Sequence, residues 1–273
     1  MPRISGWNAV TPRSTAPESA AARFELAGSL KTGMAEASDV AALPGGRFIV
    51  VGDKKDSAVI VDADGKRTAL DLPGLKNGKS QLEGVAYDPV RHNLFVSREE
   101  SRELLRYEWD PDKKAPAVLE KRFEVDAGGP TNKGIEGLAF VPGDVSPTGQ
   151  PQLLLAKEGK PRELMLLDEH GKGKQLPIKL EKEVMAVCRD FSAVTIDPKT
   201  GHLFLSSDES AAVAQIKLVR DGDKVLGKLV QSFPLRDDKG KALDRVEGLS
   251  FNERGDLFVL TENNGKLHQL KRK

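Results

Sequence analysis

The sequence predicts an all-β protein, a five-bladed β-propeller in which each blade is a sheet of four antiparallel strands. A short pattern of an inner strand, a turn, an apolar strand and an acidic residue occurs five times along the chain. The copies begin at Ser38, Glu83, Glu136, Ser192 and Glu247, which are 45, 53, 56 and 55 residues apart. These intervals lie near the roughly 40 to 50 residues of a propeller blade and exceed the period of ankyrin or tetratricopeptide repeats.

The first two strands of each blade flank a turn that contains D-P, P-G-G or N-E-R-G, or a longer turn in the third copy. The copies read SDVAALPGGRFIVVGD, EGVAYDPVRHNLFVSRE, EGLAF followed by QLLLAKE, SAVTIDPKTGHLFLSSD and EGLSFNERGDLFVLTE. Short apolar runs bounded by such turns are typical of strands. The chain therefore supplies five pairs of inner strands.

The two outer strands of each blade follow the inner pair. We expect third strands over residues 58–61, 103–109, 163–167, 212–219 and 266–271, and fourth strands over 67–72, 118–125, 174–180 and 228–235. The last copy lacks a fourth strand, and residues 23–30 look like the outer strands of the other copies. We therefore expect the N-terminal strand to close the last blade, which leaves only short protected edges. This arrangement requires no helix.

The domain organisation that follows is simple. Residues 1–22 are rich in Pro, Ser, Thr and Ala and are interpreted as a flexible tail, and residues 23–273 form the propeller. The N-terminus lacks the basic and then apolar pattern of a signal peptide. No apolar run approaches the roughly 20 residues of a membrane-spanning helix.

Composition excludes several classes of function. The 42 Lys and Arg residues nearly balance 41 Asp and Glu residues, so the net charge of +1 attracts neither nucleic acid nor an anionic membrane. Aromatic residues, at 5%, are too few for a surface that stacks nucleic-acid bases. The single cysteine, Cys188, excludes an intramolecular disulfide and a cysteine-based zinc cluster. We expect a monomer that binds neither nucleic acid nor membrane.

Acidic residues recur where the inner strands begin and where the second strands end. In a propeller these two positions lie at the same mouth of the central channel. The strand starts carry Glu83, Glu136 and Glu247, with Asp39 beside Ser38 and Asp190 two residues before Ser192. The ends of the second strands carry Asp53, Glu99, Glu158, Asp208 and Glu262. The sequence therefore predicts two rings of acids around one opening.

Converging carboxylates must raise their pKa values, pair with cations or bind a metal. We expect the first ring, with Asp39 and Asp190, to provide metal ligands, and Ca²⁺ is the natural partner because it takes roughly 6 to 8 oxygen ligands. Arg98 and Lys157 precede two acids of the second ring and would join it in contacting a ligand. The alternative is that strand-end acids are structural and accept hydrogen bonds from turn amides.

Histidine and cysteine contribute little to this prediction. His92 and His202 fall in turns on the opposite face, so neither a histidine-based triad nor a zinc site is expected at the acidic mouth. Cys188 is interpreted either as an accessible thiol near the mouth or as a small residue of a connecting loop.

The repeat units resemble the SdiA-regulated family of bacterial β-propeller proteins over residues 23–271. The segments that carry the resemblance are Leu82-Glu83-Gly84-Val85-Ala86-Tyr87-Asp88, Lys133-Gly134-Ile135-Glu136-Gly137-Leu138-Ala139-Phe140, Asp190-Phe191-Ser192, Asp208-Glu209-Ser210 and Val246-Glu247-Gly248-Leu249-Ser250. The resemblance implies a propeller without a settled activity, exported to the periplasm or envelope, with a cation in its central mouth. A cytoplasmic location stays open because no signal peptide is seen. Blade one and the inserted residues 141–151 depart from the pattern.

A weaker, motif-level similarity links the Glu-Gly pairs to calcium-dependent lactonases and phosphotriesterases of the gluconolactonase type, which have six blades. Three functions therefore compete. The first is a binding protein whose acidic mouth holds a divalent cation or a small ligand. The second is a metal-dependent hydrolase of a lactone, ester or phosphoester, and the third is a protein-interaction platform.

Overall fold

Twenty β-strands and two short helices make up the described part of the chain. The computed structural model describes residues 21–53, 55–75, 81–99, 101–125, 134–168, 175–243 and 245–273. The predicted tail lies almost entirely outside these ranges. None of the described helices is long and apolar enough to cross a membrane.

Three sheets have four strands each, and neighbouring strands within each are antiparallel. The first contains β2 (Ala37–Leu43), β3 (Arg47–Gly52), β4 (Lys55–Val61) and β5 (Arg67–Asp71), with the 3₁₀-helix η1 (Pro44–Gly46) in its first turn. The second contains β6 (Leu82–Asp88), β7 (Asn93–Arg98), β8 (Glu103–Glu108) and β9 (Val118–Glu124). The last contains β18 (Val246–Phe251), β19 (Leu257–Thr261), β20 (Lys266–Arg272) and β1 (Phe24–Lys31).

The remaining strands form one eight-stranded sheet, where two separate sheets were expected. Its halves are β10 (Ile135–Val141), β11 (Gln152–Lys157), β12 (Glu163–Asp168) and β13 (Leu176–Leu180), and then β14 (Ala193–Ile196), β15 (Leu203–Ser207), β16 (Ala212–Asp221) and β17 (Lys224–Pro234). The long strand β17 reaches β13 and pairs with it in parallel, with Leu180 opposite Gly227. A Cβ atom at Gly227 would lie 2.6 Å from the Leu180 side chain, so glycine permits this approach.

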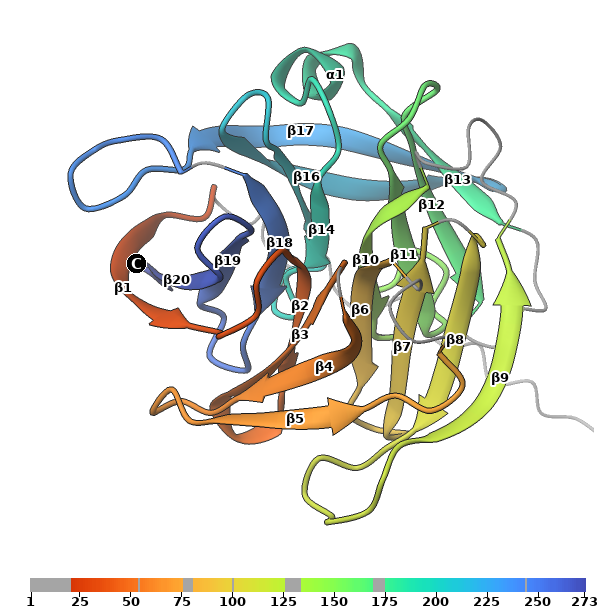
Figure 1. Ribbon diagram of the computed structural model, residues 1–273. Coiled ribbons are helices and arrows are strands. Elements are labelled where there is room, and N and C mark those ends of the chain that lie inside the picture. The colour runs from red at the N-terminus through yellow and green to blue at the C-terminus, as the bar shows by residue number, and fades with distance from the viewer. Residues whose placement is uncertain are drawn as a thin grey trace, which may run out of the picture.

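The five inner strands form a closed ring of contacts. β2 contacts β6, β6 contacts β10, β10 contacts β14, β14 contacts β18, and β18 contacts β2. Figure 1 shows these strands gathered at the middle of the molecule, with the other strands outside them. Hydrophobic clusters fill the spaces between neighbouring sheets, and one of them joins Phe48 of the first sheet to Phe258 of the last. The fold is therefore all-β and β-propeller-like.

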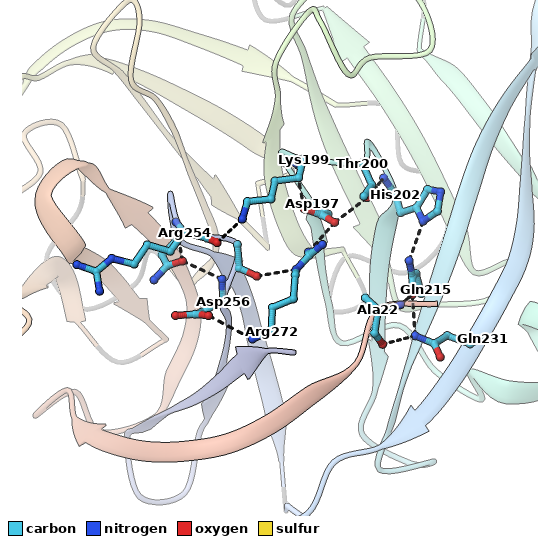
Figure 2. A network of polar contacts seen from close by, with 12 residues as sticks. Ala22, Asp197, Lys199, Thr200, His202, Gln215, Gln231, Arg254, Asp256 and Arg272 are labelled. Atoms are coloured by element: carbon cyan, nitrogen blue, oxygen red, sulfur yellow. Dashed lines mark hydrogen bonds and ion pairs between the residues drawn. The ribbon is translucent and has the colours of Figure 1, made fainter. Parts of the chain in front are cut away.

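The N-terminal strand β1 is the fourth strand of the last sheet, as the sequence predicts. It pairs antiparallel with β20, with Phe24 opposite Arg272 (Figure 1). Phe24 also packs against Phe204, Phe233 and Phe251. Arg272 reaches beyond its own sheet to Asp197, with 2.6 Å between guanidinium and carboxylate (Figure 2). The two ends of the described chain thus complete the ring together.

The expectation that the chain needs no helix is wrong at one place. Helix α1 (Lys182–Val187) lies in the connection from β13 to β14 and buries Val184. Met185 and Val187 pack beside it against the cluster inside the eight-stranded sheet. The helix therefore covers an apolar end of the core that a polar loop would leave open.

Candidate functional site

Three glutamates occupy the same place at the start of three inner strands. Leu82 pairs with Arg98 and Gly84 with Ser97, so Glu83 is an extra residue without a partner on β7. The same register shift leaves Glu136 extra on β10 and Glu247 extra on β18. Such β-bulges commonly re-aim a side chain. One repeated backbone device therefore sets the position of all three carboxylates.

The glycine after each bulged glutamate lets the next inner strand come close. A Cβ atom at Gly84 would lie 2.7 Å from the Cβ of Leu138, a residue of the next inner strand. At Gly137 it would lie 3.0 Å from the amide nitrogen of Val194, and at Gly248 3.0 Å from the Val40 side chain. The Glu-Gly pair thus combines a placed carboxylate with tight packing of the ring.

A repeated hydrogen bond holds the second row of acids beside the first. β2 has the same bulge at Ser38. The amides of three strand-end acids donate to the carbonyl two residues before the bulged residue: Asp53 to Glu36 at 3.2 Å, Glu99 to Gln81 at 3.1 Å and Glu262 to Arg245 at 3.0 Å. Glu36, Gln81 and Arg245 all have positive φ angles, of 51°, 39° and 54°. The two rows therefore lie at one end of the inner strands; we call this surface, with Glu158 and Asp208, the acidic mouth.

The carboxylates of the acidic mouth raise one another's pKa values. Burial raises the pKa of Glu136 to about 9, and the charges of Glu83, Glu99, Glu158 and Glu247 add to the effect. Burial, followed by the charges of Asp53 and Glu99, raises the pKa of Glu83 to about 8. For Glu247 the value is about 7, raised by burial, Asp208 and Glu262 and lowered by Arg245. Acids from several sheets therefore lie close enough for their charges to interact.

Other predicted acids accept hydrogen bonds within the fold. The buried carboxylate of Asp39 accepts the amides of Val40 at 2.8 Å and Val85 at 2.9 Å, and burial raises its pKa well above its usual value. Asp208 accepts the amide of Val246 at 3.1 Å.

Asp190 accepts hydrogen bonds from the hydroxyls of Ser192 and Ser207 and from the amide of Glu209. Of Asp39, Asp190 and Asp208, only Asp208 ends a second strand, and its bond to the Val246 amide fits the structural alternative for that position. Ligation of a metal by Asp39 and Asp190 stays a prediction.

The two cations of the predicted ligand set have partners outside the acidic rows. Arg98 donates to Glu103 at 2.6 Å, and Lys157, which is almost fully buried, donates to the carbonyl of Pro161 at 2.9 Å. Successive side chains of a strand point to opposite faces, so a residue next to a strand-end acid points away from it. Within the described ranges Arg245 pairs with the second row, 2.5 Å from Glu262, a pairing that the sequence did not indicate.

The donor set of the acidic mouth suits a hard cation, because it consists of carboxylate oxygens without histidine or thiol. No group of three or more His, Cys, Asp or Glu side chains within the described ranges is arranged to hold a metal ion as it stands. Cys188 is buried at the end of α1, and burial raises its pKa to about 12, so the interpretation as an accessible thiol is wrong.

The fold and the acidic mouth define a propeller-like protein with a polar site on its central ring. A glutaminyl cyclase from Myxococcus xanthus is similar at 12% identity, with a TM-score of 0.61 over 92% of this chain and 97% of that one. The PQQ-bound aldose sugar dehydrogenase from Streptomyces coelicolor is similar at 14% identity, with a TM-score of 0.57 over 93% of this chain and 99% of that one. At such identities the similarity concerns the fold alone.

The family is shown by a match along the sequence itself. The model of the SdiA-regulated family matches residues 46–265, and the chain belongs to this family. The match covers Glu83, Glu136 and Glu247 together with all five strand-end acids.

Proposed function

We propose that the acidic mouth binds a divalent cation, Ca²⁺ in the first place, either alone or as the anchor of a small ligand. The observation that carries this proposal is the placement of Glu83, Glu136 and Glu247 on equivalent β-bulges around one ring. Three partly buried carboxylates so placed repel one another when charged, and a bound cation would remove that repulsion. When bound, the cation would supply positive charge and open coordination positions for ligand oxygens.

We also propose that the strands form five blades of four, the eight-stranded sheet being two blades joined along β13 and β17. The ring of five inner strands supports this count, because each inner strand begins its own set of four. The parallel seam involves three residue pairs, whereas the antiparallel ladder between β16 and β17 runs over their full length. The acidic mouth would then collect carboxylates from every blade.

A calcium titration tests the proposed function. Isothermal titration calorimetry of EDTA-treated protein with CaCl₂ should show saturable binding. Glu136→Gln keeps the size of the side chain and removes its charge, so affinity should fall about tenfold or more, the equivalent of one lost charge-assisted interaction. Glu124→Gln, on the exposed outer strand β9, is the matched control and should bind as the wild type does.

Binding that is absent in the wild type, or equal in Glu136→Gln and Glu124→Gln, would contradict the proposed site. Circular dichroism of each variant should accompany the titration, so that a loss of folding is not taken for a loss of binding.

A metal-dependent hydrolase is the second candidate. The observation that favours it is the pair of raised pKa values, about 9 for Glu136 and about 8 for Glu83, because a carboxyl that stays protonated near neutral pH can act as a general acid. Turnover of a panel of lactones and phosphoesters should then disappear in Glu83→Gln, Glu136→Gln or Glu247→Gln. Rates equal to that of the wild type in all three folded variants would remove this candidate.

We further propose that the protein acts in the periplasm or envelope, a location that its family supports, and that it is a monomer. Cell fractionation and sedimentation velocity measure both properties directly. Recovery in the cytoplasm, or a dimer at micromolar concentration, would contradict them.

A further inference from the structure

A polar pocket lies beside the last sheet, and its lining does not include the three bulged glutamates. It has a volume of about 600 Å³ and lies between β1, the segment that follows β17, and the end of β19 with β20. Its polar lining includes Asp237, Asp238, Lys241, Asn264, Lys266 and His268. In Figure 1 the segment between β17 and β18 loops outward on the side of the molecule that carries β1.

His268 supplies the pocket with a buried nitrogen that lacks a partner. The side chain lines the pocket, the residue is only 8% exposed, and its Nε2 atom makes no hydrogen bond within the described part of the chain. Buried polar side-chain atoms nearly always have a partner, so an orphaned one points to a bound group or an ordered water. Burial and the charge of Lys266 lower the pKa of His268, which keeps the imidazole neutral at pH 7.

Hydrogen bonds hold the rest of the pocket lining in place. Asp237 accepts the amides of Lys239 at 3.0 Å and Lys241 at 2.8 Å, which fixes the segment after β17. Asn264 accepts the Thr261 hydroxyl at 2.8 Å and the Lys266 amide at 3.0 Å through its carbonyl oxygen, so its amide nitrogen remains as a donor.

The negative charges of two aspartates balance the positive charges of two lysines around the neutral imidazole of His268. A pocket with balanced charge does not select a simple cation or anion. Interleaved donors and acceptors suit a ligand whose hydroxyl groups both donate and accept. Leu26 and Leu243 add apolar surface for its carbon skeleton.

We propose that this pocket binds a neutral polyhydroxy compound, a mono- or disaccharide or a cyclic polyol. Its volume lies within the roughly 300 to 1,000 Å³ of small-molecule sites. The proposal is independent of a cation at the acidic mouth.

Imidazole-detected NMR tests the proposal with D-glucose, maltose and myo-inositol at millimolar concentrations, in EDTA. At least one of the three should shift the ring signals of His268 and leave those of His92 unchanged. Asp238→Ala removes an exposed acceptor of the lining and should raise the apparent Kd for the compound about tenfold or more, the loss of one hydrogen bond to a charged group. Asp223→Ala, in the exposed turn between β16 and β17, should respond as the wild type does.

No shift of His268 with any of the three compounds would overturn the proposal, as would equal responses in Asp238→Ala and Asp223→Ala. Glu136→Gln should keep the full response. A loss there would show that the ligand occupies the acidic mouth and would overturn the separate site.

Discussion

The glycine that follows each bulged glutamate is the residue on which the ring packs most tightly. At Gly84 an added Cβ atom would meet Ser97 Oγ at 2.6 Å and Leu138 Cβ at 2.7 Å. At Gly28, on the outer strand β1, the added atom would meet nothing within 4 Å. The two glycines therefore separate the effect of the close approach from the general effect of a glycine in a strand.

We predict that Gly84→Ala lowers the free energy of unfolding by about 1 to 3 kcal/mol, the usual cost of overpacking a core. Gly28→Ala should leave it unchanged or raise it slightly, because alanine loses less chain entropy on folding. Urea denaturation measures the free energy of unfolding of both variants. Equal losses would show that Gly84 is not required for the packing of neighbouring inner strands.

The charge state of the bulged glutamates predicts how stability depends on pH. Their pKa values rise from an ordinary 4.5 to about 8, 9 and 7 for Glu83, Glu136 and Glu247. A group with a raised pKa in the folded state contributes stability below its unfolded pKa and loses it as pH rises through the folded pKa.

The metal-free protein should therefore lose stability between about pH 4.5 and pH 9. Glu136→Gln should show a shallower loss, because one of the three groups no longer titrates. Urea midpoints at pH 5, 7 and 9 in EDTA measure the two slopes. A wild type that gains stability over this range would contradict the raised pKa values.

At the scale of elements, Arg272 at the end of β20 links the closing sheet to the turn after β14. Its guanidinium lies 2.6 Å from Asp197, whose side chain is fully buried (Figure 2). It also donates to the Gly255 carbonyl at 3.1 Å. The same guanidinium lies over the rings of Phe24 and Phe251. This one side chain therefore ties β1, β18 and β20 to the preceding sheet.

Arg272→Ala should cost about 3 kcal/mol or more, because it leaves the buried Asp197 carboxylate without its cationic partner. Lys273→Ala removes the neighbouring pair with Glu25, which is exposed, and should cost about 1 kcal/mol or less. Thermal unfolding of the two variants compares them. Equal costs would show that the link from Arg272 to Asp197 does not hold the ring closed.

Most strands and the grouping of the acids could be predicted from the sequence, because each repeat copy contains two inner strands followed by an acidic residue. The sequence did not predict the seam between β13 and β17, which depends on the contact between Gly227 and Leu180, distant in the sequence. The partners of Arg98 and Lys157 were missed, although strand alternation already directs them away from Glu99 and Glu158. Arg245 was missed although it lies two residues before Glu247, in the same repeat copy as Glu262. His268 was missed because its pocket combines β1, β20 and the segment after β17, which the repeat pattern does not relate.

At the scale of the whole molecule, ring closure turns a repeated sequence pattern into one site. Each Glu-Gly pair contributes only one carboxylate and one close contact, and the ring of β2, β6, β10, β14 and β18 brings them together. The acidic mouth and the pocket around His268 are thus different products of the fold. The first arises from the repeat, and the second arises where the chain departs from it, between the closing sheet and the segment after β17.

Thermal unfolding of the EDTA-treated protein, with and without millimolar Ca²⁺, tests the central claim most directly. A cation that binds only the folded state raises stability by about 2.7 kcal/mol at a hundred times its Kd, and each kcal/mol is worth roughly 2 to 4 °C in a domain of this size. We predict a rise of several degrees that disappears in Glu136→Gln. An unchanged unfolding temperature with Ca²⁺, Mg²⁺ and Mn²⁺ would contradict the claim and leave the carboxylates of the acidic mouth a structural role.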